Sequence, residues 1–443
     1  MSKVVIIGNG ISGITAARHI RKKSDDEIVV ISEESEYFFS RTALMYVYMG
    51  HMRWQDIEPY EPAFYSKNRI QLVFGRVKSV DFEKRLVHLS SGNPQNFDQL
   101  ILATGSKPAK FGWPGQDLPG VQGLYSKQDL ELLEKNSEGV RRAVIIGGGL
   151  IGIELAEMLV SRGIEVSYLV REDKFFGNVL SQKDAGLVTR HIKEHHIDLR
   201  INTQLKEVLS GSDGRVNAIL TDQGEKIECQ LVGLTTGVTP NIEFLKNTSL
   251  ETKRGILINE YLETNIFGVY AIGDCAEMKT PLVGRKAVEQ VWYTGRIMGE
   301  TVAATICGKR TAYQPGPWFN SAKFFDIEYQ TYGNVSSVQA ENEERFFWEH
   351  EAGKIAVHLV WEKSSGRVIG INAFGLRLRH EVFDHWLRNK ADVKSVMQHL
   401  TSANFDPEFY RRHETAIIAA FNKTFGLEIK PASKSWWQKI LRA

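Results

Sequence analysis

The chain has 443 residues, of which 42% are hydrophobic and 24% are charged, and these proportions are ordinary for a globular protein. Its formal net charge of +2 gives no electrostatic case for nucleic-acid binding. No run approaches the roughly 18 apolar residues of a membrane span, and an apolar strand already begins at Val4, so we expect no signal peptide. The three cysteines, Cys229, Cys275 and Cys307, form no closely spaced pair, which favours a reducing, cytoplasmic location.

The first predicted element is a dinucleotide-binding unit. The apolar run Val4–Ile7 predicts a strand, and a fingerprint with glycines at Gly8, Gly10 and Gly13 follows it and begins a helical stretch. In such a fingerprint the first glycine permits a tight turn, the second lets the backbone approach a pyrophosphate, and the third lets the helix pack on the strand. Glu33 lies 20 positions after Gly13 (33 − 13), where an acidic residue bonds a ribose hydroxyl.

A second unit repeats this pattern. The run Ala143–Ile146 precedes the glycine-rich sequence Gly147–Gly152, and Glu172 again lies 20 positions after the last glycine (172 − 152). Each unit closes with a buried strand and a small-residue turn, namely Ala103-Thr104-Gly105 in the first and Thr235-Thr236-Gly237 in the second. Two fingerprints with equal spacing predict two dinucleotide sites, and the economical interpretation is one for FAD and one for a nicotinamide cofactor.

The rest of the chain completes the predicted fold. The strand Val269–Ile272 ends in Gly273-Asp274, a helix is expected over about 284–307, and strand-like runs at Ile355–Trp361 and Val368–Phe374 indicate a further α+β domain. The predicted fold is therefore α/β, with two Rossmann-like dinucleotide-binding domains, the FAD domain being discontinuous, and an α+β C-terminal domain. The predicted boundaries are 1–112 and 246–310 for FAD, 113–245 for NAD(P)H, 311–430 for the C-terminal domain and 431–443 for a basic aromatic tail.

The order of these motifs resembles that of the flavoprotein reductases related to the pyridine nucleotide-disulfide oxidoreductases. The resemblance covers about residues 1–310. Within that superfamily, Phe39–Leu44 is similar to the Tyr-x-Arg-x-x-Leu segment of ferredoxin and rubredoxin reductases, of the flavin part of nitrite reductase and of apoptosis-inducing factor. Trp318–Ser321 followed by Tyr332-Gly333 is similar to the start of the C-terminal domain in the last of these.

The resemblance implies the residues of both cofactor sites. For FAD these are Gly8, Gly10, Ser12, Gly13, Glu33, Arg41, Val77, Ala103, Thr104, Gly105, Gly273 and Asp274. For the nicotinamide cofactor these are Gly147, Gly149, Ile151, Gly152, Arg171, Glu172 and Gly237. Glu172 favours NADH because a carboxylate repels a 2′-phosphate, whereas the adjacent Arg171 would favour NADPH, which stays an alternative.

Four further residues are candidates for the catalytic site. The resemblance implies that Glu154 lies beside the nicotinamide, and that Glu289, Gln290 and Trp292 lie near the pyrimidine end of the flavin, where a helix N-terminus can stabilise negative charge. The alternatives are an exposed helix residue for Glu154, core packing for Trp292 and a solvated surface side chain for Arg41.

The cysteine pattern decides the expected subclass. Related coenzyme A disulfide reductases carry a redox-active cysteine at about residues 40–43, where this chain has Ser40–Ala43. Without a thiolate there is no dithiol exchange, and Cys275, next to Asp274, is expected to be a buried structural thiol. We therefore expect hydride transfer from NADH to FAD and electron delivery to an external acceptor, namely a small ferredoxin-like or rubredoxin-like protein.

Two other features suggest alternatives. The tail Ser433–Arg442 is basic and aromatic, so it could rest on a membrane surface, which would favour an NADH:quinone oxidoreductase, or it could pack on protein. A slow NADH-sensing flavoprotein is a third interpretation, and a homodimer is expected. No metal site is predicted, because the cluster His191, His195 and His196 has no carboxylate or cysteine at ligand spacing, and His380-Glu381 with His385 departs from HExxH by one residue.

Overall fold

The structure is a computed structural model of the chain, and it describes every residue except 407–410 and 433–443. Contacts divide the chain into two compact units. The first consists of residues 1–147, 155–166 and 205–315, and the second consists of residues 148–154, 167–204 and those from 316 onward. The division passes through α5 (Leu150–Ser161) and β11 (Glu165–Leu169), both in the second predicted nucleotide unit, and the domain boundaries proposed from the sequence remain a prediction.

The first unit is built on a parallel five-stranded sheet. Its strand order is β19-β7-β1-β2-β3, so the first predicted strand lies at its centre. The strands are β19 (Val269–Ala271), β7 (Gln99–Leu102), β1 (Lys3–Ile7), β2 (Glu27–Ser32) and β3 (Ile70–Phe74). Val4, Val5 and Ile6 are fully buried, as expected for a central strand that is covered on both faces.

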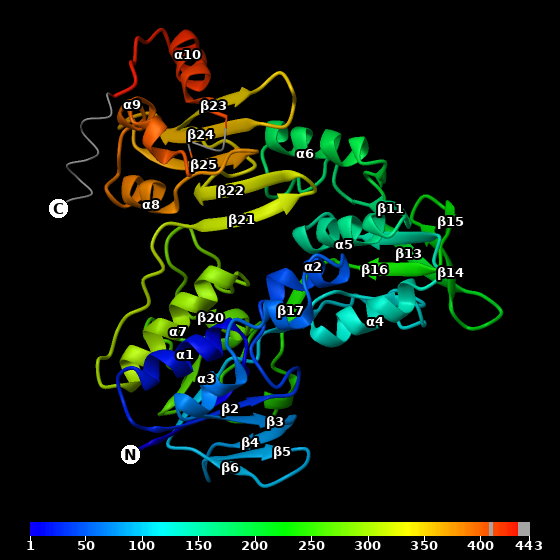
Figure 1. Cartoon of the computed structure of the whole chain (residues 1–443), viewed down its shortest axis with the longest axis vertical. Coiled ribbons are helices and arrows are strands. Elements are labelled where there is room, and N and C mark those ends of the chain that lie inside the picture. The colour runs from blue at the N-terminus through cyan, green and yellow to red at the C-terminus, as the bar shows by residue number, and fades with distance from the viewer. Residues whose placement is uncertain (407–410, 433–443) are drawn as a thin grey trace. The chain divides into compact units, whose positions relative to one another are not determined.

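Two helices pack side by side on this sheet. They are α1 (Ile11–Arg21) and α7 (Trp292–Ile306), which are adjacent although they lie far apart in the sequence (Figure 1). Ile14 of α1 and Met298 and Val302 of α7 belong to the same buried cluster as the sheet residues. Residues from both ends of this unit's sequence therefore form one core, as a discontinuous domain requires.

The first unit contains further strands and helices. The strand β10 (Arg142–Ile146) pairs in parallel with β16 (Leu231–Leu234), which pairs with β9 (Val121–Gln122). Two antiparallel sheets contain β4 (Val77–Asp81), β5 (Leu86–Leu89) and β6 (Gln95–Asn96), and β13 (Leu205–Ser210), β14 (Val216–Thr221) and β15 (Lys226–Glu228). Two further pairs are β8 (Ser106–Pro108) with β17 (Val238–Pro240), and β18 (Ile256–Ile258) with β20 (Ala276–Met278). The helices are α2 (Leu44–Tyr48), α3 (Pro62–Lys67) and α4 (Lys127–Ser137).

The second unit contains an antiparallel five-stranded sheet. Its strand order is β21-β22-β25-β24-β23, and all neighbouring strands pair antiparallel (Figure 1). The strands are β21 (Phe319–Phe324), β22 (Ile327–Gly333), β23 (Glu343–Glu349), β24 (Ala356–Glu362) and β25 (Val368–Phe374). Its helices are α6 (Gln182–Glu194), α8 (His380–Arg388), α9 (Val393–Gln398) and α10 (Glu414–Phe425), and its parallel strand pair is β11 with β12 (Asp198–Arg200).

The helix expected over about 284–307 is wrong at its start. The structure begins α7 at Trp292, and Val291 before it is extended, with φ −136° and ψ 137°. The preceding segment contains Gly284 at φ +74°, and its Ala287 carbonyl accepts a hydrogen bond from the Met278 amide. A partner in β20 thus takes the backbone group that a helix would have used. Among the described helices, none combines the length and apolar character needed to cross a bilayer.

Candidate functional site

The three glycines of the first fingerprint are required for different reasons. A Cβ on Gly8, where φ is +112°, would lie 2.1 Å from the Ala103 carbonyl oxygen, and a Cβ on Gly13 would lie 2.0 Å from the Gly8 carbonyl oxygen. A Cβ on Gly10 would meet no protein atom within 4 Å. The fold itself therefore demands Gly8 and Gly13, whereas the space beside Gly10 is open, as a backbone approach to a pyrophosphate requires.

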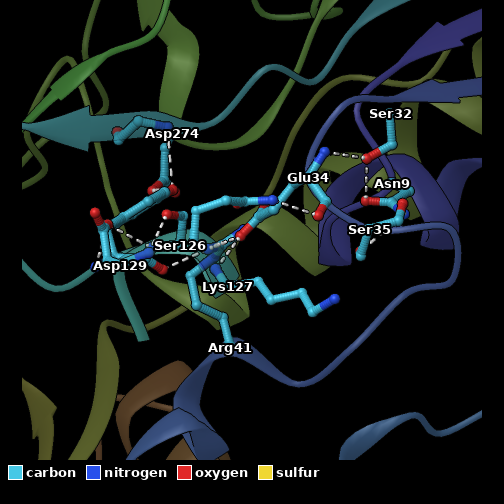
Figure 2. Close-up of polar contacts among 12 residues, drawn as sticks. Asn9, Ser32, Glu34, Ser35, Arg41, Ser126, Lys127, Asp129 and Asp274 are labelled. Atoms are coloured by element: carbon cyan, nitrogen blue, oxygen red, sulfur yellow. Dashed lines mark hydrogen bonds and ion pairs between the residues drawn. The ribbon is translucent and has the colours of Figure 1, made fainter. Parts of the chain in front are cut away.

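The loop after β2 is tied to this fingerprint. The Asn9 side-chain amide donates to the Ser35 carbonyl at 2.8 Å, and the Ser32 hydroxyl donates to Asn9 Oδ1 at 3.0 Å (Figure 2). Glu33 lies in this loop with an exposed carboxylate, 3.5 Å from Arg76 Nε. The predicted ribose-binding acid is thereby held near the fingerprint with its carboxylate accessible, whereas Val77 is half-buried against the core.

Ser12 connects the fingerprint to the Gly-Asp turn. A Cβ on Gly273, at φ +73°, would lie 2.4 Å from the Ser12 hydroxyl oxygen, and a Cβ on Gly295 of α7 would lie 2.6 Å from it. Asp274 follows in a 3₁₀ turn. The structure thus brings together α1, the strand end at Gly273-Asp274 and α7, as the sequence prediction of one discontinuous site requires.

Arg41 is paired with a residue that the sequence analysis did not single out. Its guanidinium donates to both carboxylate oxygens of Glu34, at 2.7 and 2.6 Å, and to the Tyr125 carbonyl (Figure 2). Burial opposes the positive charge, but Glu34 outweighs this effect, so the pKa of Arg41 is raised. The interpretation of Arg41 as a solvated surface side chain is wrong, because a bidentate ion pair holds it.

Tyr125 extends this network to Asp274. Its hydroxyl donates to Asp274 Oδ2 at 3.2 Å and accepts from the Ser106 amide at 3.0 Å. Burial raises the pKa of Asp274 above its ordinary value, while the Tyr125 hydrogen bond and the charge of Arg41 act in the opposite direction. Arg41, Tyr125 and Asp274, three groups from distant parts of the sequence, therefore form one polar cluster at the end of the first sheet.

The two small-residue turns lead into a shared strand pair. β8 follows Gly105 and β17 follows Gly237, and the two strands pair antiparallel, with Ser106 opposite Pro240. The Thr104 hydroxyl donates to the Asn241 carbonyl at 2.8 Å. Gln290 contacts both strands, since its amide donates to the Ser106 hydroxyl at 2.8 Å and to the Val238 carbonyl at 3.4 Å.

The other two flavin-side candidates lie near Gln290 in the sequence but differ in their surroundings. Glu289 is 8% exposed and accepts from Arg285 at 2.6 Å, so its carboxylate is occupied by a buried ion pair. Trp292 begins α7 and is half-buried, with its ring 5.3 Å from that of Tyr293. Of the three, Gln290 is the one whose side chain bridges the paired strands.

The second fingerprint has the same division of roles. In the first unit, a Cβ on Gly147, at φ +115°, would lie 2.6 Å from the Thr235 carbonyl oxygen. In the second unit, a Cβ on Gly148 would lie 2.9 Å from the Val170 side chain, whereas a Cβ on Gly149 would meet nothing within 4 Å. Gly149 is therefore the counterpart of Gly10, and Ile151 and Gly152 follow in the first turn of α5.

The acidic residue of the second fingerprint points toward its glycines. Glu172 Oε2 lies 3.7 Å from the position of a Cβ on Gly148, and Glu172 Oε1 accepts from Arg171 Nε at 2.9 Å. The Arg171 side chain is 69% exposed and that of Glu172 is 22% exposed. Glu154 of α5 is half-buried, and after burial it is the second cause of the raised pKa of Tyr168.

None of the three cysteines is in a disulfide. Cys275 is fully buried and its thiol donates to the Leu102 and Ile272 carbonyls, both at 3.4 Å. Burial raises its pKa, which disfavours the thiolate. The expectation of a buried structural thiol beside Asp274 is confirmed.

The fold and the open spaces beside Gly10 and Gly149 indicate an oxidoreductase that binds two dinucleotides. Comparisons with known proteins support this class. Residues 2–299 match the family described as pyridine nucleotide-disulphide oxidoreductase. Rubredoxin-NAD(+) reductase from Pseudomonas putida is 27% identical over 319 residues, which cover 71% of this chain and 83% of that one. Rhodocoxin reductase from Rhodococcus erythropolis is 30% identical over 328 residues, covering 72% and 76%. The structure of a ferredoxin reductase from Rhodopseudomonas palustris aligns with a TM-score of 0.78 and 23% identity, covering 92% of this chain and 96% of that one.

The chain belongs to the pyridine nucleotide-disulphide oxidoreductase family, because the match spans well over half of it. It is an NAD(P)H-dependent flavoprotein oxidoreductase whose cofactors are FAD and NADH. Glu34, Tyr125 and Ser106 were not predicted from the sequence. Only Glu34 had a local signal, since it directly follows the predicted ribose-binding acid, whereas Tyr125 reaches Asp274 across 149 positions.

Proposed function

We propose that this chain transfers electrons from NADH through FAD to a small ferredoxin-like or rubredoxin-like protein. The observation that carries the proposal is the absence of a usable thiol. Ser40–Ala43 contains no cysteine, and the thiol of Cys275 is turned into the core. The relatives named rubredoxin-NAD(+) reductase and rhodocoxin reductase support an acceptor of this class.

The protein's own groups bind and orient the cofactors. Gly10 and the N-terminus of α1 offer backbone N–H groups to the FAD pyrophosphate, and Gly149 and the N-terminus of α5 offer them to NADH. The Arg41–Glu34 pair and the Tyr125–Asp274 pair fix the polar wall beside the first fingerprint. Gln290 links the turns that follow the two sheets, and we propose that it sets how the turns face each other. FAD, when bound, supplies the chemistry by accepting an electron pair from NADH and passing electrons on.

Glu172 carries the proposed preference for NADH. Its carboxylate lies beside the second fingerprint, where it accepts from a ribose hydroxyl and repels a 2′-phosphate. We expect Glu172→Gln to raise the KM for NADH about tenfold, the value of roughly one charge-assisted hydrogen bond, and to narrow the preference over NADPH. Steady-state kinetics with both cofactors checks this. A native enzyme with a lower KM for NADPH would contradict it.

Two other functions compete with this one. The alternative of an NADH:quinone oxidoreductase is based on the basic aromatic tail, most of which lies outside the described residues. A slow NADH-sensing flavoprotein would instead change its oligomeric state when NADH binds. We propose that the chain is a cytoplasmic homodimer both with and without NADH. Size-exclusion chromatography in the presence and absence of NADH checks this oligomeric state.

The deciding experiment is anaerobic NADH oxidation by the FAD-loaded chain, with ferredoxin, rubredoxin and a short-chain quinone as separate acceptors. We expect at least one of the two proteins to be reduced faster than the quinone. The Gly149→Ala variant is the control, because its new Cβ meets no protein atom and it should keep FAD while losing NADH-dependent turnover. Fast quinone reduction with slow protein reduction would overturn the proposal.

A further inference from the structure

Three potential ligands converge in the second unit. His191 and His195 lie four positions apart at the end of α6 and therefore share one face. Asp326 lies in the tight turn between β21 and β22. One atom of each, namely His191 Nε2, His195 Nε2 and Asp326 Oδ1, can serve as a ligand, and this group alone meets that condition among the described residues.

The distances among these atoms are short. Asp326 Oδ1 lies 2.6 Å from His191 Nε2 and 2.9 Å from His195 Nε2, and the two nitrogens are 3.2 Å apart. A zinc-class ion binds nitrogen and oxygen at about 2.0–2.1 Å, which sets tetrahedral ligands about 3.3 Å apart. An ion placed above this triangle would need Asp326 Oδ1 to move about 0.7 Å farther from His191 Nε2 and about 0.4 Å farther from His195 Nε2, while the two nitrogens already lie near the required separation.

The His191 ring has a carboxylate beside each of its nitrogens. His191 Nδ1 lies 3.3 Å from Glu194 Oε2, and His191 Nε2 faces Asp326. A neutral ring carries one N–H, so a lone pair faces a carboxylate on one side or the other. If Nδ1–H donates to Glu194, the Nε2 lone pair and the carboxylate oxygen of Asp326 both point inward, which is the arrangement of a metal-binding histidine with an outer carboxylate.

The surroundings hold the ligands in position. The His191 side chain is 1% exposed. The His195 ring stacks on Phe325, with centroids 4.2 Å apart and an interplanar angle of 8°. Phe325 has φ +54°, a conformation that is costly for a bulky residue. Asp326 Oδ2 accepts from Lys354 at 2.8 Å, which leaves Oδ1 directed at the imidazoles.

We propose that His191, His195 and Asp326 bind a divalent transition-metal ion of the zinc class. The ligand set of two imidazoles and one carboxylate suits that class. The side chains of Asp326 and His195 are 52% and 33% exposed, so water can reach the fourth position. The ion would join the end of α6 to the β21–β22 turn and would have a structural role that does not depend on the electron acceptor.

Zinc binding by the untagged, FAD-loaded chain tests this proposal. After treatment with a chelator, equilibrium dialysis should show one Zn²⁺ bound per chain. Saturating zinc should raise the midpoint of thermal unfolding by about 5 °C. Asp326→Asn and His195→Gln should each weaken zinc binding at least tenfold and abolish the thermal shift, because each removes a ligand.

His196→Asn is the matched control. His196 is exposed, has φ +60° and is not part of the ligand triangle, and asparagine tolerates that conformation. The control should bind zinc like the native chain. Flavin content and circular dichroism establish that each variant is folded. If Asp326→Asn does not fold, His195→Gln alone tests the loss of zinc binding. The proposal would be overturned if the native chain bound no zinc, or if both ligand variants bound zinc as tightly as the native chain. The three side chains would then form only a hydrogen-bonded cluster.

Discussion

At the residue scale, the two fingerprints separate glycines that the fold requires from glycines that a ligand requires. Gly8 and Gly13 face backbone oxygens at about 2 Å from a would-be Cβ, so any side chain there must move a strand or a helix. Gly10 has φ −66° and ψ −177°, which any residue adopts, and its Cβ position is empty. The need for glycine at position 10 therefore comes from the cofactor.

We predict different outcomes for Gly10→Ala and Gly13→Ala. The midpoint of thermal unfolding of the Gly10→Ala apoprotein should lie within about 2 °C of that of the native apoprotein, because the new Cβ meets no protein atom. The same variant should bind FAD at least tenfold more weakly. Gly13→Ala should destabilise the apoprotein by about 2 kcal/mol or more through overpacking. Thermal unfolding and flavin content after purification check both. Full flavin content in Gly10→Ala would contradict the assignment.

The three thiols make a second prediction at this scale. Burial raises the pKa of Cys229 to about 12 and raises that of Cys275 and Cys307 as well. Thiolates are the reactive form, so at pH 8 the native chain should react slowly with an alkylating reagent, and half-buried Cys307 should react first. Mass spectrometry of the labelled chain checks this, with the unfolded chain as control. Rapid labelling of Cys275 in the native chain would contradict its assignment as an unreactive structural thiol.

At the element scale, the contact between α1 and α7 positions the first cofactor site. A Cβ on Gly299 would lie 2.6 Å from the Ser12 carbonyl oxygen and 2.9 Å from the Thr15 Cβ, so the two helices approach at van der Waals distance. This close approach places the N-terminus of α7 and the fingerprint in one unit. This helix begins at Trp292, later than the start at about 284 that the sequence predicted.

Gly299→Ala should destabilise the protein by about 2 kcal/mol, because the added methyl group has no space. The matched control is Gly186→Ala in α6, where the new Cβ meets no atom within 4 Å. Alanine propensity should there stabilise by up to about 1 kcal/mol. Denaturant unfolding of both variants measures the difference, and equal stabilities would show that the helices separate easily.

At the scale of the whole molecule, the acceptor decides which proposal holds. The basic aromatic residues 433–443 are the sole basis of the quinone proposal, and they lie outside the described residues. Charge and aromatic side chains favour membrane surfaces, but so short a segment binds a bilayer weakly. The proposed acceptor protein does not require them.

We therefore predict that a chain ending at Ala432 reduces its acceptor protein at a rate within about twofold of the full chain, since all the cofactor-site residues predicted from the sequence lie at or before Asp274. The rate of NADH-dependent acceptor reduction checks this, and binding of both chains to anionic vesicles serves as the second measurement. A loss of quinone reduction together with a loss of vesicle binding would favour the membrane alternative.

The sequence by itself determined the nucleotide units. The predicted strands at Val4–Ile7 and Ala143–Ile146 occur as β1 and β10, and both glycine loops follow them. These features are local, because an apolar run, a glycine turn and a helix start are written in consecutive residues. The absence of a cysteine in Ser40–Ala43, which predicted the subclass without a redox-active disulfide, is likewise a local feature of the sequence.

Only the tertiary structure decided which side chains meet. Arg41 meets Tyr125 across 84 positions, and His195 meets Asp326 across 131. The sequence predicted no metal site because no carboxylate or cysteine stands at ligand spacing from these histidines, whereas the β21–β22 turn brings Asp326 within 3 Å of both. Such contacts depend on how strands and helices pack, and packing joins residues whose distance in the sequence carries no information about their distance in space.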